Sequence, residues 1–147
     1  MLSVIDDVAR AVPDASVIAI DIPIGLVERG RRRADVEVRA LLGRRRSSLF
    51  MTPVRAALEA ASHAEGSSLS VAAGEPGISR QAYGLRARIF EVERWLPTAP
   101  CRVCEAHPEL CFTELRGGAP PSASKKTWHG MIAVSYTHLT LPTILRV

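Results

Sequence analysis

A short apolar run, Val17 to Ile20, ends abruptly at Asp21 and constrains the fold more than any other part of the sequence. Its residues are mostly β-branched and show no polar alternation, which is typical of a strand buried in an α/β sheet. Pro23 and Gly25 follow closely, and both residue types break regular structure. The run therefore predicts a buried strand that carries a carboxylate at its carboxyl end.

Segments with helical periodicity surround this strand, and a second strand is expected from Cys101 to Ala106. Thr52 and Pro53 suit the N-cap and the first position of a helix, whereas serines and glycines indicate a loop over residues 65–77. The helices are expected over roughly residues 2–12, 33–42, 52–61, 78–96 and 108–115, with a last one capped by Ser124. Strands that alternate with helices predict an α/β layer fold.

The composition excludes several classes of protein. Apolar residues make up 47% and charged residues 23% of the 147-residue chain, which is an ordinary globular balance. No apolar run has the length of a membrane span, and the N-terminus lacks the basic region of a secretory signal. Three cysteines, an odd number, do not indicate a disulfide scaffold. We therefore expect a cytoplasmic protein without a membrane partner.

Asp21 and Glu105 are the first candidate site residues, because each lies at the carboxyl end of a predicted strand. Ligands of open α/β sheets bind beyond these ends. Two carboxylates there offer the hard oxygen ligands that a divalent metal prefers, with positions left for phosphate and water. The alternative for Asp21 is a cap on the loop that follows it.

Two further polar residues, His107 and Glu109, follow the second strand. Glu109 is a third candidate ligand, although the helix dipole alone favours an acid in a first turn. His107 suits an N-cap, a histidine at the edge of the core or a proton shuttle. Together with Cys101, Cys104 and Cys111, His107 has a spacing superficially like that of a zinc site. Because the first two cysteines fall on opposite faces of a strand, small buried hydrophobic cysteines are favoured instead.

Positive charge is concentrated between Arg29 and Arg55, where nine arginines stand against two acidic residues in a chain of net charge +4. Such a segment favours contact with a polyanion, and the alternative is a solvated arginine-rich helix and loop. Lysines at a helix start are unfavourable unless an anion binds there, which singles out the pair after Ser124. The candidate substrate-binding residues are Arg44, Arg45, Arg46, Ser47, Ser48, Arg55, Lys125 and Lys126.

Five groups of residues occur in an order that carries a family resemblance. They are Asp21–Leu26; Leu42–Phe50 with Pro53–Arg55; Gly77–Ala82; Glu105–Glu109 with Phe112; and Ser124–Thr127 with Gly130. Together they resemble domain-of-unknown-function family 429, whose members are described as predicted RNase H-like nucleases. The resemblance covers roughly residues 16–133 and implies an RNase H-like fold, with a mixed central sheet flanked by helices. It also implies metal-dependent phosphodiester hydrolysis, with Mg²⁺ or Mn²⁺ held by Asp21 and Glu105.

The resemblance further implies that residues 1–134 are a fragment of a single RNase H-like domain. The family's opening strand and its closing acidic helix have no counterpart here, so we expect the fragment to be inactive or impaired. The string from Val134 to Thr143 resembles the translation of a sequencing-adapter read-through. We therefore expect residues 135–147 to be a non-native tail that does not belong to the fold.

Three functions remain open from the sequence. The leading one is a metal-dependent nuclease that acts on nucleic acid, with catalytic residues Asp21, Glu105, Glu109 and His107. The second is a nucleic-acid or polyanion-binding module without catalysis, in which binding depends on salt and on Arg44 to Arg46. The third is a hydrolase of a small phosphorylated metabolite that uses the same acids and bases.

Overall fold

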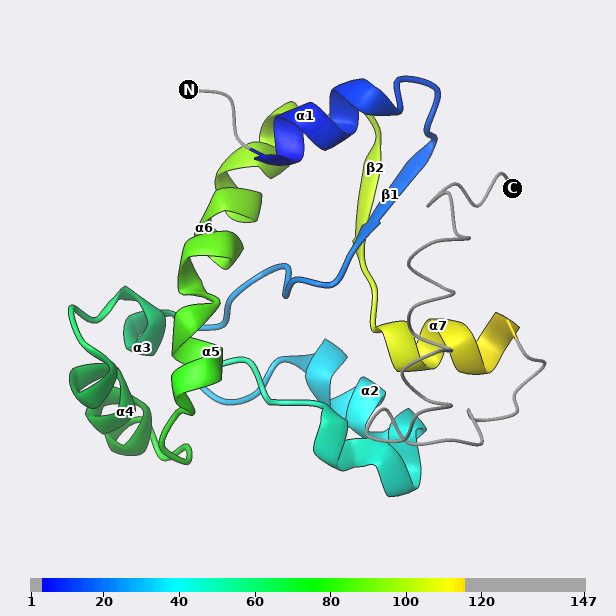
Figure 1. The fold of residues 1–147 in the computed structure, drawn as a ribbon. Helices are drawn as coiled ribbons and strands as arrows, with labels where there is room; N and C mark the ends of the chain where they lie inside the picture. Colours follow the sequence, from blue (N-terminus) through cyan, green and yellow to red (C-terminus); the bar gives the residue numbers. More distant parts are fainter. Residues whose placement is uncertain (1–3, 116–147) are drawn as a thin grey trace, which may run out of the picture.

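The computed structural model describes residues 4–115, without the side chains of Val4, Val8, Arg44, Arg45 and Ser48. Figure 1 shows helices around a small sheet, which confirms the expected α/β class. The elements are α1 (Val4–Ala11), β1 (Val17–Ile20), α2 (Arg33–Leu42), the 3-10 helix η1 (Gly43–Ser48), α3 (Arg55–Glu59), α4 (His63–Ala72), α5 (Arg80–Gly84), α6 (Arg86–Trp95), the 3-10 helix η2 (Leu96–Thr98), β2 (Arg102–Glu105) and α7 (Pro108–Leu115).

Strands β1 and β2 pair in parallel, with Val17 opposite Arg102 and Ile20 opposite Glu105. Both strands lie where the sequence predicts them. The expectation that β1 is fully buried is wrong, because Val17 is 43% exposed and Ala19 is also exposed. Within residues 4–115 the sheet consists of these two strands, so alternate side chains of β1 face solvent. Ile18 and Ile20 are half-buried, whereas Val17 and Ala19 are exposed.

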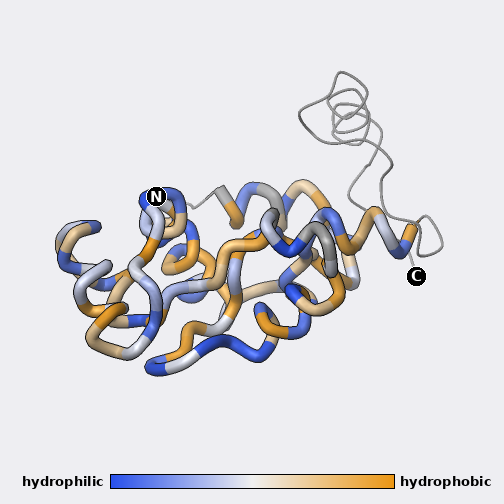
Figure 2. The backbone as a smooth tube through the Cα atoms, turned by 90° about the horizontal axis from the view of Figure 1, so that it is seen from below, coloured by the Kyte–Doolittle hydropathy of each residue, from blue (hydrophilic) through white to orange (hydrophobic). Residues whose placement is uncertain are grey.

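The core lies among α3, α5, α6 and the segment that leads into α3. Val54, Leu58, Ile89 and Val92 are almost completely buried there, and Trp95 closes the end of α6. Hydrophobic and hydrophilic stretches alternate along the chain (Figure 2), as expected where helices bury one face. The apolar face predicted over residues 78–96 is confirmed at Ile89 and Val92, but it belongs to two helices, α5 and α6, rather than one.

Helix α4 replaces the first part of the loop predicted over residues 65–77, so that prediction is wrong up to Ala72 and confirmed for residues 73–77. Ser62 is the N-cap, since its side chain accepts a hydrogen bond from the Glu65 backbone at 3.2 Å. The Glu65 carboxylate in turn accepts from the backbone N–H of Ala61 at 3.0 Å. This capping pair starts α4 although the helix contains three serines and a glycine. Gly66 is buried in α4 because it faces the backbone carbonyl of Ala57 in α3.

The start of the next helix is also corrected. Helix α3 begins at Arg55, and the cap position belongs to Val54, which makes no side-chain cap bond. Thr52 lies before the helix, and its polar groups bond to other parts of the chain. By contrast, α2 ends at Gly43 as expected, where a φ of +50° suits glycine.

Several expectations lie outside the described residues. These are the helix after Ser124, the basic residues Lys125 and Lys126, and the tail over residues 135–147. Between residues 4 and 115, no helix combines the length and apolar character that crossing a membrane requires.

Candidate functional site

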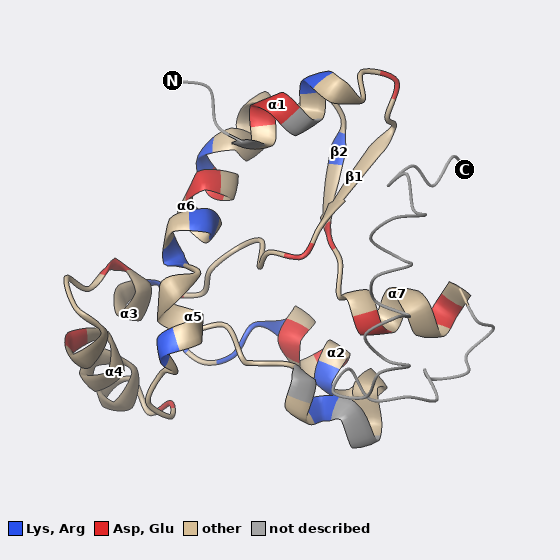
Figure 3. Cartoon of the chain, in the orientation of Figure 1, with Lys and Arg blue, Asp and Glu red and all other residues tan. Residues whose placement is uncertain are grey.

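The carboxyl ends of β1 and β2 meet at one edge of the sheet. Ile20 is the register partner of Glu105, and its carbonyl accepts a hydrogen bond from the Ala106 backbone at 2.8 Å. Asp21 follows Ile20 directly, so the two predicted carboxylates reach the same edge. Figure 3 shows acidic segments at the ends of both strands. The placement that parallel pairing predicts for Asp21 and Glu105 is therefore found.

Glu105 is held at this edge by a buried arginine, Arg32. Both terminal nitrogens of the Arg32 guanidinium donate to the Glu105 carboxylate, one of them to Oε1 at 3.3 Å. The Arg32 side chain is 4% exposed, whereas the Glu105 side chain is 31% exposed. The ion pair therefore joins a buried arginine to a partly exposed carboxylate at the end of β2.

Arg32 has two further partners inside the protein. It donates to Asp35 Oδ1 at 3.0 Å and to Thr52 Oγ1 at 2.9 Å. The other oxygen of Asp35 accepts from the backbone N–H of Thr52 at 2.8 Å. Asp35 is 3% exposed, and a charge buried this deeply requires a charged or hydrogen-bonding partner. Arg32, Asp35 and Thr52 thus form a buried network that supports the strand edge from behind.

The same ion pair also binds the loop that follows Asp21. The backbone N–H of Ile24 donates to Glu105 Oε2 at 2.9 Å, and Arg32 donates to the Ile24 carbonyl at 2.9 Å. Both backbone polar groups of Ile24 are therefore satisfied by one arginine–glutamate pair. We call Arg32, Asp35, Thr52, Glu105 and Ile24 the Arg32 network.

Sequence reasoning missed Arg32, Asp35 and Thr52 as site residues. Arg32 stands within a run of arginines that resembles a solvated charge cluster. One local signal was available, because Asp35 is three residues after Arg32 and that spacing allows an ion pair across the start of α2. Thr52 gave no such signal, since its partners come from distant parts of the sequence.

The oxygen donors at this edge match a divalent metal only in part. Carboxylate oxygens such as those of Asp21 and Glu105 are of the type that Mg²⁺ or Mn²⁺ prefers. However, Glu105 already accepts hydrogen bonds from Arg32 and Ile24. Within residues 4–115, no three or more histidine, cysteine or acidic side chains are placed to hold a metal ion. The described residues thus offer the right donor type without a complete ligand set.

The two polar residues after β2 start helix α7. The carbonyl of His107 accepts from the backbone of Leu110 and of Cys111, each at 3.0 Å. Its ring Nδ1 is buried and has no hydrogen-bond partner among the described residues. Glu109 lies in the first turn of α7 and is 7% exposed. The predicted roles of His107 as proton shuttle and of Glu109 as metal ligand stay predictions.

Arg55, a predicted substrate-binding residue, is surrounded by carboxylates. It contacts Glu28 at 3.3 Å, Glu59 at 3.4 Å and both carboxylate oxygens of Glu93. Hydrogen bonding to Glu93 raises the pKa of Arg55, and the same bond lowers the pKa of Glu93. Arg55 therefore joins α3 to α6 and to the loop at Glu28, and its charge is already balanced by acids of the chain.

The remaining predicted basic site lies in η1. Arg46 and Ser47 are exposed there, directly after the carboxyl end of α2. The backbone of Arg44, Arg45 and Ser48 belongs to the same 3-10 helix. This position leaves Arg46 accessible to a polyanion.

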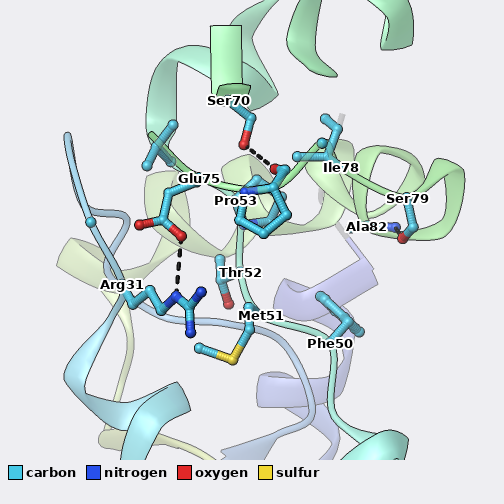
Figure 4. A pocket seen from close by; sticks show the side chains of 14 residues that line it. Arg31, Phe50, Met51, Thr52, Pro53, Ser70, Glu75, Ile78, Ser79 and Ala82 are labelled. Atoms are coloured by element: carbon cyan, nitrogen blue, oxygen red, sulfur yellow. Dashed lines mark hydrogen bonds and ion pairs between the residues drawn. The ribbon is translucent and has the colours of Figure 1, made fainter. Parts of the chain in front are cut away.

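A cavity of about 250 Å³ has Thr52 of the Arg32 network in its lining (Figure 4). Its polar side chains are bonded within the protein: Arg31 to Glu75 at 3.1 Å, and Ser70 to the carbonyl of Pro76 at 2.7 Å. Phe50, Met51 and Ile78 supply apolar lining, and neither Asp21 nor Glu105 lines it. These polar side chains are thus already bonded within the protein and are not free to bind a ligand. The strand edge therefore remains the candidate site.

These features define an α/β protein whose polar residues gather at the carboxyl edge of a parallel strand pair. The model of a family described as "Protein of unknown function (DUF429)" matches residues 1–135. The chain belongs to this family, which confirms the resemblance found in the sequence. No curated protein and no solved structure matches the chain.

Proposed function

We propose that the chain is part of a metal-dependent nuclease with an RNase H-like fold, and that the carboxyl edge of β1 and β2 is its reaction centre. The observation that carries the proposal is the parallel register of Ile20 with Glu105. This register brings carboxylates from distant parts of the sequence to one edge, where ligands of α/β sheets bind.

Asp21 is the residue to which we assign the closest role in the reaction. It is exposed, and it directly follows the strand whose last residue pairs with Glu105. When bound, Mg²⁺ or Mn²⁺ would activate water and neutralise charge on the phosphate, with Asp21 as its oxygen ligand at this edge. Glu105 is not assigned a ligand position here, because its carboxylate already accepts hydrogen bonds from Arg32 and Ile24. Further ligands would have to come from outside the described residues.

Arg46 and its neighbours in η1 are assigned the less specific part of substrate binding. Arginines contact phosphate through charge and geometry without reading the base sequence. Arg55 is not assigned this role, because Glu28, Glu59 and Glu93 already balance its charge. Nucleic acid is therefore proposed to approach the strand edge from the side of η1.

The proposal is tested by cleavage of labelled DNA, RNA and hybrid oligonucleotides by the full-length gene product, with Mg²⁺, with Mn²⁺ and with EDTA. Asp21→Asn is expected to lower the rate by about 100-fold or more, and EDTA is expected to abolish cleavage. Asp14→Asn is the matched control, since Asp14 is exposed before the opposite end of β1. Retained cleavage in Asp21→Asn, or cleavage that EDTA does not affect, would contradict the proposal.

Small phosphate esters separate this function from that of a metabolite hydrolase. Hydrolysis of such esters together with intact oligonucleotides would favour the metabolite enzyme. Binding of oligonucleotides without cleavage of either substrate would favour a binding module.

A further inference from the structure

We propose that Arg32 and Glu105 act together as a positioning pair that sets the place of Asp21. The reactive role of Asp21 rests on the proposed function, whereas the positioning of its loop does not. The pair holds Ile24 by both backbone polar groups. Arg32 and Glu105 thus act on Asp21 through the short loop that runs from Asp21 to Ile24.

Two anchors, both on the end of β2, enclose Asp21. Before it, the Ile20 carbonyl accepts from the Ala106 backbone at 2.8 Å. After it, the Ile24 N–H donates to Glu105 Oε2 at 2.9 Å. Because the intervening segment is so short, fixing both ends strongly restricts where the Asp21 carboxylate can lie.

Arg32 is suited to this task because it cannot easily move. Its guanidinium is 4% exposed and is fixed from the interior by Asp35 and Thr52. A planar fork of donors can reach several acceptors at once, which a lysine ammonium on its flexible stem does not reproduce. The interior therefore fixes Arg32, Arg32 fixes Glu105, and together they fix Ile24.

Amide hydrogen exchange of Ile24 in the full-length protein, measured by NMR, tests the positioning directly. Arg32→Lys and Glu105→Ala are each expected to accelerate this exchange by about tenfold or more, because the N–H loses its fixed acceptor. Glu105→Gln retains an acceptor and is expected to fall between Glu105→Ala and the unmodified protein. This last variant keeps the test decisive if Arg32→Lys does not fold.

Matched controls come from the ion pair next in the sequence. Arg33 contacts Glu37 at 2.6 Å, and the two side chains are 93% and 58% exposed. Arg33→Lys and Glu37→Gln change the same residue types at the surface of α2. They are expected to leave the exchange of Ile24 unchanged.

The values of kcat and KM add a measurement that distinguishes positioning from general destabilisation. Glu105→Ala is expected to lower kcat by about tenfold or more with KM for the oligonucleotide little changed, since substrate contacts remain. In an Asp21→Asn background, Glu105→Ala is expected to cause no further loss, because it acts through Asp21. A further loss of similar size in that background would contradict an effect through Asp21.

Mn²⁺ binding separates positioning from direct ligation by Glu105. Weaker Mn²⁺ binding in Glu105→Ala with unchanged exchange of Ile24 would make Glu105 a metal ligand and overturn the proposal. Unchanged exchange in both Arg32→Lys and Glu105→Ala would also overturn it. If the unmodified protein cleaves nothing, the nuclease proposal fails, and the exchange result still decides whether the pair positions the loop.

Discussion

Gly66 of α4 lies against the backbone carbonyl oxygen of Ala57 in α3, so closely that an added Cβ would come within 2.3 Å of that oxygen. Backbone atoms cannot move aside as a side chain can, so Gly66→Ala is expected to push the two helices apart. We expect a loss of about 1–3 kcal/mol in the free energy of unfolding, although alanine is the better helix former. Urea unfolding followed by circular dichroism measures this change.

Gly84 provides the control for this prediction. A Cβ at Gly84, the last residue of α5, meets nothing within 4 Å. Gly84→Ala is therefore expected to leave stability unchanged or to raise it by up to about 1 kcal/mol. Equal stability of the two variants would show that α3 and α4 do not approach as closely as described.

Acid should weaken the contact between α3 and α6 through Glu93. The hydrogen bond from Arg55 lowers the pKa of Glu93 below the ordinary glutamate value of 4.5. A carboxyl whose pKa is lowered by folding contributes stability that is fully present above its unfolded pKa. That stability is lost as the pH falls through the lower, folded value. Glu93→Gln is thus expected to unfold at a lower temperature at pH 7, and the difference should shrink toward pH 3.

Thermal unfolding from pH 7 to pH 3 measures the effect. Glu37→Gln is the control, because the Arg33–Glu37 pair is exposed and contributes little to stability. A difference between Glu93→Gln and the unmodified protein that stays constant with pH would mean that the ionised form of Glu93 is not the stabilising one.

The parts of the fold predicted correctly are those specified by neighbouring residues. The apolar run ending at Asp21 predicts β1, and the glycine at position 43 predicts the end of α2. The loop prediction over residues 65–77 failed up to Ala72, where α4 ends, because it relied on composition. Two residue-specific contacts outweigh composition there: the cap between Ser62 and Glu65, and the close approach of Gly66 to α3.

The candidate site was predictable to the same limited degree. Parallel strands end at a common edge, so sequence could place Asp21 near Glu105. It could not identify Arg32, since the nearest acidic residue, Asp35, is only one of four partners drawn from separate parts of the chain. The same long-range bonding explains why Thr52 was mistaken for a helix cap.

Binding of nucleic acid through η1 is expected to depend steeply on salt. Replacing Arg44, Arg45 and Arg46 together by glutamine removes the basic run that follows α2. The slope of log affinity against log salt is expected to fall by about 0.7–0.9 for each arginine that contacts a phosphate. Fluorescence anisotropy of a labelled oligonucleotide at several salt concentrations measures this slope.

A variant of equal charge tests whether position matters in that experiment. Arg10, Arg80 and Arg94 are exposed on α1, α5 and α6, so replacing them by glutamine changes the net charge equally. This variant is expected to keep most of the slope. If both variants lose the same amount, binding follows net charge and η1 is not the contact site.

Thr52→Val is expected to destabilise the protein through Arg32. Valine has nearly the shape of threonine but cannot accept the hydrogen bond that Arg32 donates at 2.9 Å. Loss of a buried bond to a charged group costs about 1.5–3 kcal/mol in the free energy of unfolding. Thr52→Ser keeps the acceptor and should lose less.

A double-mutant cycle with Arg32→Lys determines which role of Thr52 is correct. If Thr52 acts through Arg32, the loss caused by Thr52→Val should shrink by about 0.5–3 kcal/mol in the Arg32→Lys background. A helix cap at Thr52 would act on the backbone of α3 instead, and its loss would be the same with arginine or lysine at position 32. Chemical unfolding of the four proteins of the cycle distinguishes the two. A coupling energy of zero would mean that Thr52 does not stabilise the protein through Arg32.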